Sequence, residues 1–463
     1  MTQLAHRKCR GIRCIPAVLA LGLMALMLIP LLAPPAYATT ANLNDAKAKY
    51  SVTDDRVITV TAGTSRVQHY IDEAASNATA QKKCIVYLPE GTYAVSSKLV
   101  VPANVVLVGE TESKVFPSEA VDALVELNGS VYGGYFDGKK IAKTVLKFRE
   151  NSFSNNNGRI DKSIVTNAYN YGIAGKGQGC QNFVVSGVKV TKSGKSGISV
   201  MDAAYVKTIE NSQFCNNGAN KEGAGINLSH ADAGAIKNCN INYNADKAVS
   251  TNSDPVSGYK YDHPGCTITT ITGCTMKGNG VNGVYIKPNC KLYHFTKNKM
   301  YGNNDCLSAV AKTPAGTVGK SIIKDVSGNT FKGSKNIQIK AAGKGAAIYM
   351  GSNNKVIYGK KGGIEAENRG KVIIRGSKNL IKYQKGAGLN VRGGGYVLLT
   401  GTGDVISDNK HSSVYCTTKG KVVIKKARIK GRIYCVTKGS VYLYSVKRSG
   451  KIATGSGGTV TKK

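Results

Sequence analysis

Carboxylate, imidazole and amino groups that could carry out acid–base chemistry gather between residues 202 and 287. Three of the five histidines beyond residue 38 fall between residues 230 and 294. A carboxylate beside an imidazole favours the imidazolium form, and a lysine can accept a proton or bind a substrate carboxylate. These residue types are also common in turns, so a purely structural role is the alternative. The catalytic candidates are Asp202, His230, Asp232, Asp262, His263 and Lys287.

Polar side chains at matched positions of short strands are candidates for substrate binding. The segments 197–202, 225–230, 248–253 and 283–288 align with one another, and alternate residues of a strand face the same side. One predicted outward row is Ser199, Asn227, Ser250 and Tyr285, and the next is Met201, Ser229, Asn252 and Lys287. An insertion at residues 254–265 adds aromatic and acidic groups. The predicted substrate-binding residues are Asn227, Asn252, Tyr261 and Tyr285.

A recurring phrase predicts the elements that must position these residues. Residues 209–214, 236–241, 271–276 and 295–300 each have large apolar residues at both ends, a small or amide residue between them, and a Gly or Asn turn afterwards. The closing apolar residues lie 27, 35, 24 and 31 residues apart, at Phe214, Ile241, Met276, Met300 and Phe331. Such spacing is typical of the coils of a solenoid with loops of varying length. The column Ser212, Cys239, Cys274, Asn298 and Asn329 is predicted to point inward at a turn, with each amide bonded to its neighbour.

The segment 64–110 carries a family resemblance. The apolar spacing over 66–75 predicts a helix, and strands are expected at 84–88, 92–95 and 98–108. The sequences Val86-Tyr87-Leu88-Pro89-Glu90-Gly91-Thr92-Tyr93 and 99–109 resemble the opening of the pectin-lyase-like superfamily. The resemblance implies an all-β fold, a right-handed parallel β-helix of three sheets with a short N-terminal capping helix.

The family's catalytic motifs are largely missing. Of the paired aspartates, Gly-His-Gly and Arg-Ile-Lys typical of its polygalacturonases, only Arg428-Ile429-Lys430 occurs. Its pectate lyases bind calcium through acidic residues, so calcium is a cofactor by resemblance alone, and no matching acidic cluster is evident. No metal ligands are predicted among the site residues, and the lack of C-x-x-C argues against zinc.

The remaining chain divides by composition. Basic residues before position 14, an apolar run over 15–33 and Ala36-Tyr37-Ala38 predict a cleaved signal peptide at 1–38, with an uncleaved signal anchor as the alternative. The protein is therefore expected to be secreted or on the cell surface, with no membrane span after cleavage. The predicted parts are a cap and first coil, a central β-helix, basic coils and a disordered tail, at 39–110, 111–331, 332–448 and 449–463.

Charge predicts an acidic partner. The net charge is +37, and residues 312–463 hold 31 Lys and Arg against 5 Asp and Glu. An exported basic surface of this size favours an acidic polysaccharide or wall polymer, whereas nucleic acid is disfavoured because no recognition motif accompanies it. General solubility without a partner is the plain alternative.

Together these features predict action on a uronic-acid polysaccharide. The catalytic version is a lyase, an epimerase or a glycoside hydrolase. The non-catalytic version is a cell-surface or adhesion protein that binds acidic wall polymers through its basic C-terminal coils. The first requires the cluster between residues 202 and 287, and the second requires only the lysines beyond residue 312.

Ten cysteines follow the leader, and three pairs share a register. These pairs are Cys239 with Cys274, Cys266 with Cys290, and Cys416 with Cys435. Export permits disulfides, and stacked strands lie about 4.8 Å apart, within disulfide reach. Disulfides are therefore expected, with a ladder of buried thiols as the alternative, because parallel Cβ vectors spoil the geometry of the bond.

Overall fold

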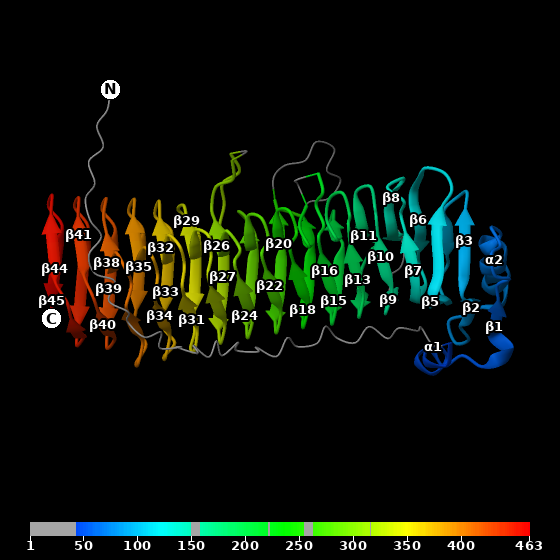
Figure 1. Ribbon diagram of the computed structural model, residues 1–463, viewed down its shortest axis with the longest axis horizontal. Helices are drawn as coiled ribbons and strands as arrows, with labels where there is room; N and C mark the ends of the chain where they lie inside the picture. Colours follow the sequence, from blue (N-terminus) through cyan, green and yellow to red (C-terminus); the bar gives the residue numbers. More distant parts are fainter. Residues whose placement is uncertain (1–42, 150–157, 221–222, 254–262, 315) are drawn as a thin grey trace, which may run out of the picture. The chain divides into compact units, whose positions relative to one another are not determined.

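The computed structural model describes residues 43–149, 158–220, 223–253, 263–314 and 316–463. In these residues the chain winds into stacked coils, and the named strands pair in parallel within two sheets of 30 and 15 strands (Figure 1). The 15-stranded sheet, called sheet B, takes one strand from each coil, and the 30-stranded sheet A takes the rest. The predicted all-β parallel solenoid is confirmed, and two of the three expected sheets merge into sheet A.

Sheet B contains the strands that carry the predicted rows of site residues. Its strands are β4 (Leu99–Val101), β6 (Val121–Leu127), β8 (Ala142–Phe148), β11 (Tyr171–Lys176), β14 (Ile198–Met201), β17 (Ile226–Ser229), β20 (Lys247–Asn252), β23 (Asn282–Ile286), β26 (Asp305–Val310), β29 (Ile337–Ala342), β32 (Gly362–Glu367), β35 (Ala387–Arg392), β38 (Ser412–Cys416), β41 (Ile433–Val436) and β44 (Ile452–Gly455).

Sheet A contains two strands from most coils. Strands β1 (Val57–Thr59) and β2 (Cys84–Leu88) come before the first strand of sheet B. The strands that follow a strand of sheet B are β5 (Val105–Pro117), β7 (Ser130–Asp137), β9 (Arg159–Asp161), β12 (Phe183–Ser186), β15 (Tyr205–Glu210), β18 (Asp232–Lys237), β21 (Thr267–Thr272), β24 (Lys291–Thr296), β27 (Ser321–Ser327), β30 (Ala346–Met350), β33 (Lys371–Ile374), β36 (Tyr396–Leu399), β39 (Lys421–Lys425), β42 (Ser440–Tyr444) and β45 (Thr459–Lys462). The strands that precede the next sheet B strand are β3 (Gly91–Val95), β10 (Ile164–Thr166), β13 (Lys189–Thr191), β16 (Gln213–Cys215), β19 (Asn240–Asn242), β22 (Thr275–Lys277), β25 (Lys299–Tyr301), β28 (Thr330–Lys332), β31 (Lys355–Ile357), β34 (Leu380–Lys382), β37 (Val405–Ser407), β40 (Arg428–Lys430) and β43 (Lys447–Ser449).

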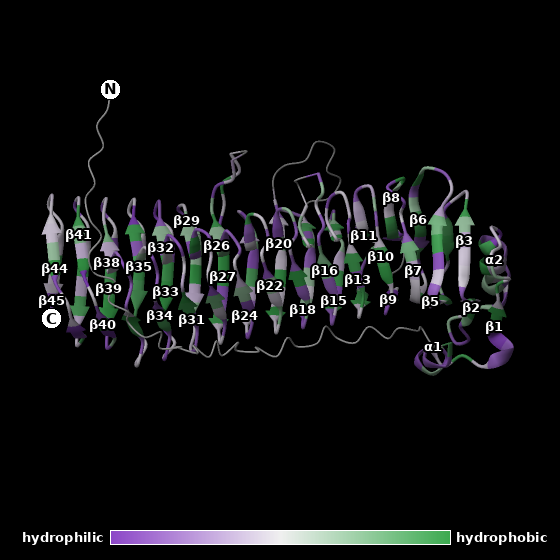
Figure 2. Ribbon diagram, in the orientation of Figure 1, coloured by the Kyte–Doolittle hydropathy of each residue, from purple (hydrophilic) through white to green (hydrophobic). Residues whose placement is uncertain are grey.

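The core is a stack of apolar residues repeated from coil to coil. Phe214 lies opposite Ile241, and Met276, Met300 and Phe331 continue along the next coils, all fully buried. Buried and outward residues alternate along strands such as β39 and β42, so green and purple are mixed along the strands in Figure 2. The predicted coil register is confirmed over this region, because one face of each strand must join the common core.

Two helices lie at the first coils. Helix α2 (Val67–Asn77) buries Val67, Ile71 and Ala74, in agreement with the helix predicted at 66–75. Helix α1 (Leu43–Tyr50) was not predicted. It packs Ala46 and Tyr50 on outward apolar residues of sheet A such as Val106 and Tyr132, so its partners lie far away in the sequence.

The prediction of a disordered tail at 449–463 is wrong. Strands β44 and β45 continue sheets B and A by pairing with β41 and β42. Ile452 and Val460 pack against the core, so two apolar residues suffice for a coil that stacks on an existing one. The expected signal peptide lies outside the described residues, and no helix within the described ranges is long and apolar enough to cross a membrane.

The predicted inward column at the turn within sheet A is confirmed as a polar ladder. Ser212, Cys239, Cys274, Asn298 and Asn329 are fully buried, and the column continues as Asn354, Asn379 and Asp404. Each asparagine Nδ2 donates to the side-chain oxygen of the next coil, as from Asn329 to Asn354 at 3.1 Å. A second ladder joins Asn217, Asn244, Asn279 and Asn303 where the coil turns back to sheet B.

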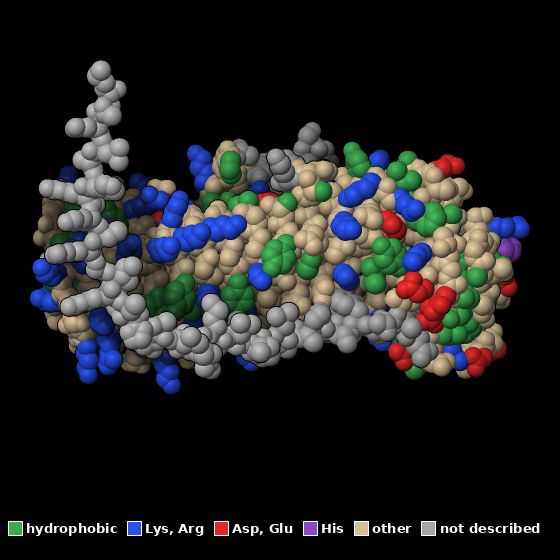
Figure 3. Space-filling view, in the orientation of Figure 1, with side chains coloured by type: hydrophobic (Ala, Val, Ile, Leu, Met, Phe, Trp, Pro, Cys, Tyr) green, Lys and Arg blue, Asp and Glu red, His purple; other side chains and the backbone are tan. Residues whose placement is uncertain are grey.

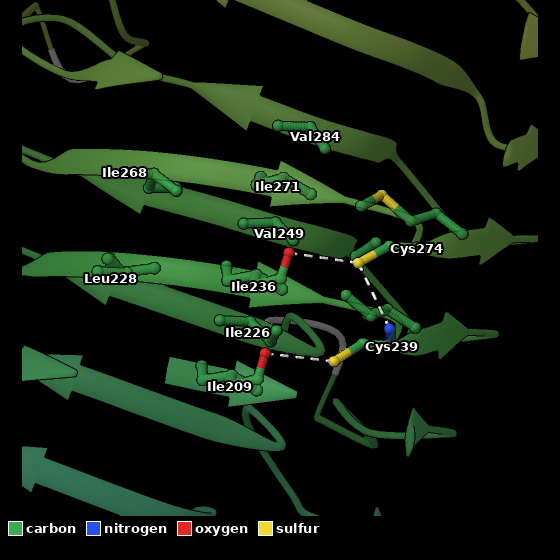
Figure 4. Packing of buried hydrophobic residues seen from close by; sticks show 14 of the residues in the cluster. Ile209, Ile226, Leu228, Ile236, Cys239, Val249, Ile268, Ile271, Cys274 and Val284 are labelled. Carbon is green, nitrogen blue, oxygen red and sulfur yellow. Dashed lines mark hydrogen bonds between the residues drawn. The ribbon is translucent and has the colours of Figure 1, made fainter. Parts of the chain in front are cut away.

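The cysteines have the predicted register, but the expected disulfides are not formed. Cys416 lies directly opposite Cys435 in sheet B. All ten cysteines in the described residues are free, and nine of them are buried. Figure 4 shows the Cys239 and Cys274 thiols side by side, each donating to a backbone carbonyl of the preceding coil. Side chains at equivalent positions of parallel strands project alongside one another, which favours the thiol ladder over the bond.

Candidate functional site

The predicted outward rows are present on sheet B. Ser199, Asn227, Ser250 and Tyr285 lie opposite one another in successive coils, as do Met201, Ser229 and Asn252 in the neighbouring row. Asn227 Nδ2 donates to Ser199 Oγ at 3.3 Å, so side chains bridge the coils along the row. Lys287 extends the second row, because its Nζ donates to Asn252 Oδ1 at 2.7 Å. Tyr285 lies beside Lys247, whose Nζ is 5.3 Å from the ring centroid.

Asp202 and His230 occupy the turn after sheet B in neighbouring coils. Both adopt left-handed backbone conformations, and the amide of Ala203 donates to the His230 carbonyl at 2.6 Å. The Asp202 carboxylate forms its ion pair with Lys176, one coil earlier, at 3.2 Å. His230 is buried, and its Nδ1 lies 3.5 Å from Ser229 Oγ. Asp202 and His230 are therefore stacked in neighbouring coils, as the sequence predicts, and the Asp202 carboxylate is paired with Lys176.

Asp232 and His263 form a carboxylate–imidazole contact between two predicted residues. His263 Nε2 lies 3.3 Å from Asp232 Oδ2, and its Nδ1 lies 2.6 Å from the Gly265 carbonyl. The hydrogen bond to Asp232 raises the pKa of His263 against the opposing effect of burial. Asp232 Oδ1 also accepts the Thr267 amide at 2.5 Å, which fixes the carboxylate. Asp262 and Tyr261 lie outside the described residues.

A charged cluster farther along sheet B was not predicted. Lys340, Glu365, Glu367 and Arg392, called here the ion-pair cluster, lie on β29, β32 and β35. Lys340 Nζ lies 3.4 Å from Glu365 Oε1 and 2.7 Å from Glu367 Oε1, and Arg392 Nη2 lies 2.5 Å from Glu367 Oε2. Asn390 Nδ2 donates to Glu365 Oε2 at 2.5 Å.

The two carboxyl groups of the ion-pair cluster have opposite pKa shifts. Burial raises the pKa of Glu365, whose side chain is only 4% exposed, despite the nearby cations. Burial also acts on Glu367, but the hydrogen bond and charge of Lys340, with Arg392, lower its pKa. Carboxyl groups whose environments separate their pKa values are suited to donate and accept protons in turn. Structural ion pairs produce such shifts as well, so the cluster is a candidate site and also a stabilising feature.

The sequence contained one signal for this cluster. Glu365 lies directly opposite Lys340 and Asn390, and the adjoining row places Glu367 opposite Arg392, at a coil step of 25 residues. The same step separates Gly370, Gly395 and Gly420. Because the charged residues of the ion-pair cluster follow the same 25-residue step as these glycines, their contacts were predictable from the sequence.

Lysines also stack at the entry to sheet B. Lys335, Lys360, Lys385 and Lys410, called here the lysine column, are exposed on successive coils. Each backbone amide donates to the preceding coil, as from Lys385 to the Gly359 carbonyl at 2.9 Å. Within the described residues no group of three or more His, Cys, Asp or Glu is placed to hold a metal ion.

Comparison with known proteins supports the fold. Residues 51–219 match the family described as rhamnogalacturonase A/epimerase, pectate lyase-like, and residues 152–335 match the right-handed β-helix region. A double mutant of the tailspike of E. coli bacteriophage HK620 shares 13% identity and a TM-score of 0.50, covering 88% of this chain and 78% of that chain.

A GH87 α-1,3-glucanase catalytic unit from Streptomyces thermodiastaticus shares 14% identity and a TM-score of 0.46 over 74% of this chain. The match spans 63% of the glucanase, less than two thirds of its length. No curated protein sequence matches the chain.

Proposed function

From the premise that the chain is a right-handed parallel β-helix with a pectate lyase-like N-terminal part, we propose that it binds an acidic polysaccharide through its basic C-terminal coils. Such a protein acts at the cell surface or outside the cell. The polymer lies along the stacked coils, so that successive acidic sugars meet successive lysines.

The observation that carries this proposal is unbalanced charge. Residues 312–463 hold 31 basic residues against 5 acidic ones, a balance of +26. In the described part of this region the ion pairs with these acids involve Lys340, Arg392, Lys430 and the upstream His294. Figure 3 shows the consequence on one face, where Lys and Arg side chains gather over the later coils and acidic ones over the first. Unpaired exposed lysines attract polyanions.

The lysine column provides a direct test. Replacing Lys360, Lys385 and Lys410 together by Gln is expected to weaken binding of polygalacturonate about tenfold at about 50 mM salt, because fewer counterions are released. Binding by the unaltered protein should fall steeply toward about 1 M salt, since exposed charges are then screened. Isothermal titration calorimetry across a salt series measures both effects.

The matched control removes three exposed lysines from earlier coils, Lys189, Lys207 and Lys299. This triple variant is expected to bind nearly as well as the unaltered protein. Equal losses in the two variants would assign binding to net charge alone. Binding that does not respond to salt would overturn the proposal.

Catalysis on the same polymer is a second candidate, favoured by the opposed pKa shifts of Glu365 and Glu367. Glu367, whose pKa is lowered, suits proton removal from a uronate or activation of water, and Glu365, whose pKa is raised, suits donation to the departing glycosidic oxygen when it carries a proton. The predicted set of Asp202, His230, Asp232, Asp262, His263 and Lys287 offers the competing location, centred on the Asp232–His263 pair.

Two variants separate these locations. Pectate, alginate and hyaluronate are incubated with the protein, and unsaturated uronate or new reducing ends are measured. We expect Glu365→Gln to abolish any activity and His263→Ala to retain it. The reverse outcome would place the chemistry among the residues first predicted, and inactivity of the unaltered protein on all three polymers would leave binding as the function.

A further inference from the structure

A second structural column runs beside the lysine column, at the corner where each coil leaves sheet A for sheet B. Its residues are Tyr243, Gly278, Gly302, Gly333, Tyr358 and Tyr383, all with left-handed backbone conformations. The amides link neighbouring coils, for example Gly302 to the Lys332 carbonyl at 3.1 Å and Gly333 to the Ile357 carbonyl at 3.1 Å. These positions are therefore equivalent rungs of one column.

The left-handed backbone conformation at these positions of the column is unfavourable for tyrosine. A bulky residue with a φ near 60° is a conformational outlier, whereas glycine adopts this region freely. Tyr243, Tyr358 and Tyr383 nevertheless occupy it, and their side chains are 50%, 49% and 45% exposed. The Tyr358 and Tyr383 rings stack with centroids 5.2 Å apart and planes at 15°. Strain that places aromatic rings in solvent indicates a role outside the fold.

Two glycines leave an opening between these tyrosines. A Cβ added at Gly302 or Gly333 would meet no atom within 4 Å. A Cβ at Gly278 would approach the Tyr243 ring at 2.8 Å, so this ring covers Gly278. Gly302 and Gly333 therefore form the floor of a notch with Tyr243 at one end and Tyr358 at the other. Coils are spaced by about 4.8 Å, so two open rungs have the dimensions of a sugar ring.

Each end of the notch also carries a cation. Lys277 Nζ lies 5.6 Å from the centroid of the Tyr243 ring, and Lys332 Nζ lies 5.7 Å from that of Tyr358. An aromatic face packs on the C–H face of a pyranose, and an ammonium beside it pairs with a carboxylate on the same sugar. A neutral sugar has no carboxylate to pair with these lysines, and a polyanion without sugar rings has no C–H face to pack on these tyrosines.

We propose that this notch binds a uronic acid unit, stacked on Tyr358 with its carboxylate on Lys332, and thereby selects acidic polysaccharides over other polyanions. The inference rests on the proposed binding function and gives it a specific subsite. From the notch the polymer continues along the lysine column, whose members Lys335 and Lys360 follow Gly333 and Tyr358 by two residues.

Filling the notch tests the proposal without altering charge. Gly333→Tyr adds a ring at a rung of the kind that already holds tyrosine at 243, 358 and 383, so the variant is expected to fold. We expect it to bind oligogalacturonate about tenfold more weakly and to bind polyphosphate, which has no sugar ring, as the unaltered protein does. Tyr358→Ala should have the same pair of effects. Tyr349→Ala, which removes another exposed tyrosine of sheet A, is the control and should leave both ligands unaffected.

The outcomes distinguish the subsite from the broader function. An unaltered protein that binds neither ligand overturns both proposals. Normal oligogalacturonate binding by Gly333→Tyr and Tyr358→Ala overturns the notch and leaves polyanion binding intact. Equal losses for oligogalacturonate and polyphosphate also overturn the notch as a sugar subsite, because the rings would then contribute nothing specific to a sugar.

Discussion

Replacing Lys340 by Met is expected to lower the free energy of unfolding by about 3 kcal/mol, because it leaves the Glu365 and Glu367 carboxylates with Arg392 as their remaining cation. Glu365 is almost completely buried, and removing one partner of a buried pair leaves charge that water cannot solvate. Urea unfolding followed by circular dichroism gives the change as a shift of the midpoint.

The loss should depend on pH. Burial already raises the pKa of Glu365 above its usual 4.5, and Lys340 is the second-largest influence on it, in the opposite direction. Without Lys340 the folded state holds the Glu365 proton more tightly still, so stability falls as pH rises above 4.5. The deficit of the variant is therefore larger at about pH 8 than at about pH 5.

A double variant is the control for this explanation. Lys340→Met combined with Glu365→Leu replaces the buried pair by apolar groups and should recover most of the lost stability. If the double variant is as unstable as Lys340→Met alone, the loss arises from the packing of the lysine stem, and the electrostatic account is wrong.

Asn329→Leu is expected to lower the free energy of unfolding by at least about 3 kcal/mol, since it interrupts the polar ladder at both neighbours. Asn329 Nδ2 donates to the Phe295 carbonyl at 2.8 Å and to Asn354 Oδ1 at 3.1 Å, and its Oδ1 accepts the Asn298 amide at 2.9 Å. Leucine has a similar volume and offers none of these bonds, so buried polar groups remain without partners. Thermal and urea unfolding measure the change.

The control is Asn353→Gly, an exposed asparagine with a left-handed backbone beside the next rung. This change removes an amide outside the ladder and should alter stability by less than about 0.5 kcal/mol. Comparable losses in the two variants would mean that the ladder bonds contribute little beyond the turn conformation.

The coil register was predictable because one physical constraint acts at every repeat. Phe214, Met276 and Phe331 must reach the same core, and Asn298 must find a partner at the same depth. Helix α1 was not predictable in this way, because it packs on the outer face of sheet A and leaves no repeated pattern. The strands of the C-terminal tail were not predicted because this segment contains few apolar residues. Its Ile452 and Val460 find their packing partners in the preceding coil.

The sequence predicted how the rows of sheet B align, including Asn227 and Tyr285, but not that Ser199 and Ser250 of the same row are buried. It did not place the charges of the ion-pair cluster, because partners such as Lys340 and Glu365 meet only through the coil step. The Tyr358 and Tyr383 pair escaped notice for a related reason. Their left-handed backbone and mutual stacking are properties of three-dimensional position that neither residue type nor local pattern expresses.

The polar ladder ends at a buried acid. In each rung the amide N–H points toward the next coil, so the side-chain dipoles from Asn298 to Asn379 lie head to tail. Aligned dipoles accumulate partial positive charge at the end where the donors point, as at the N-terminus of a helix. Asp404 occupies that end, accepting from the Asn379 amide at 2.8 Å and from its Nδ2 at 3.1 Å, and the following rung is Ala427. Burial nevertheless raises the pKa of the Asp404 carboxyl group, and the bonds from Asn379 oppose this rise without reversing it. The row of neutral amides thus offsets part of the cost of burying the acid, where a lysine or an arginine would pair with it directly.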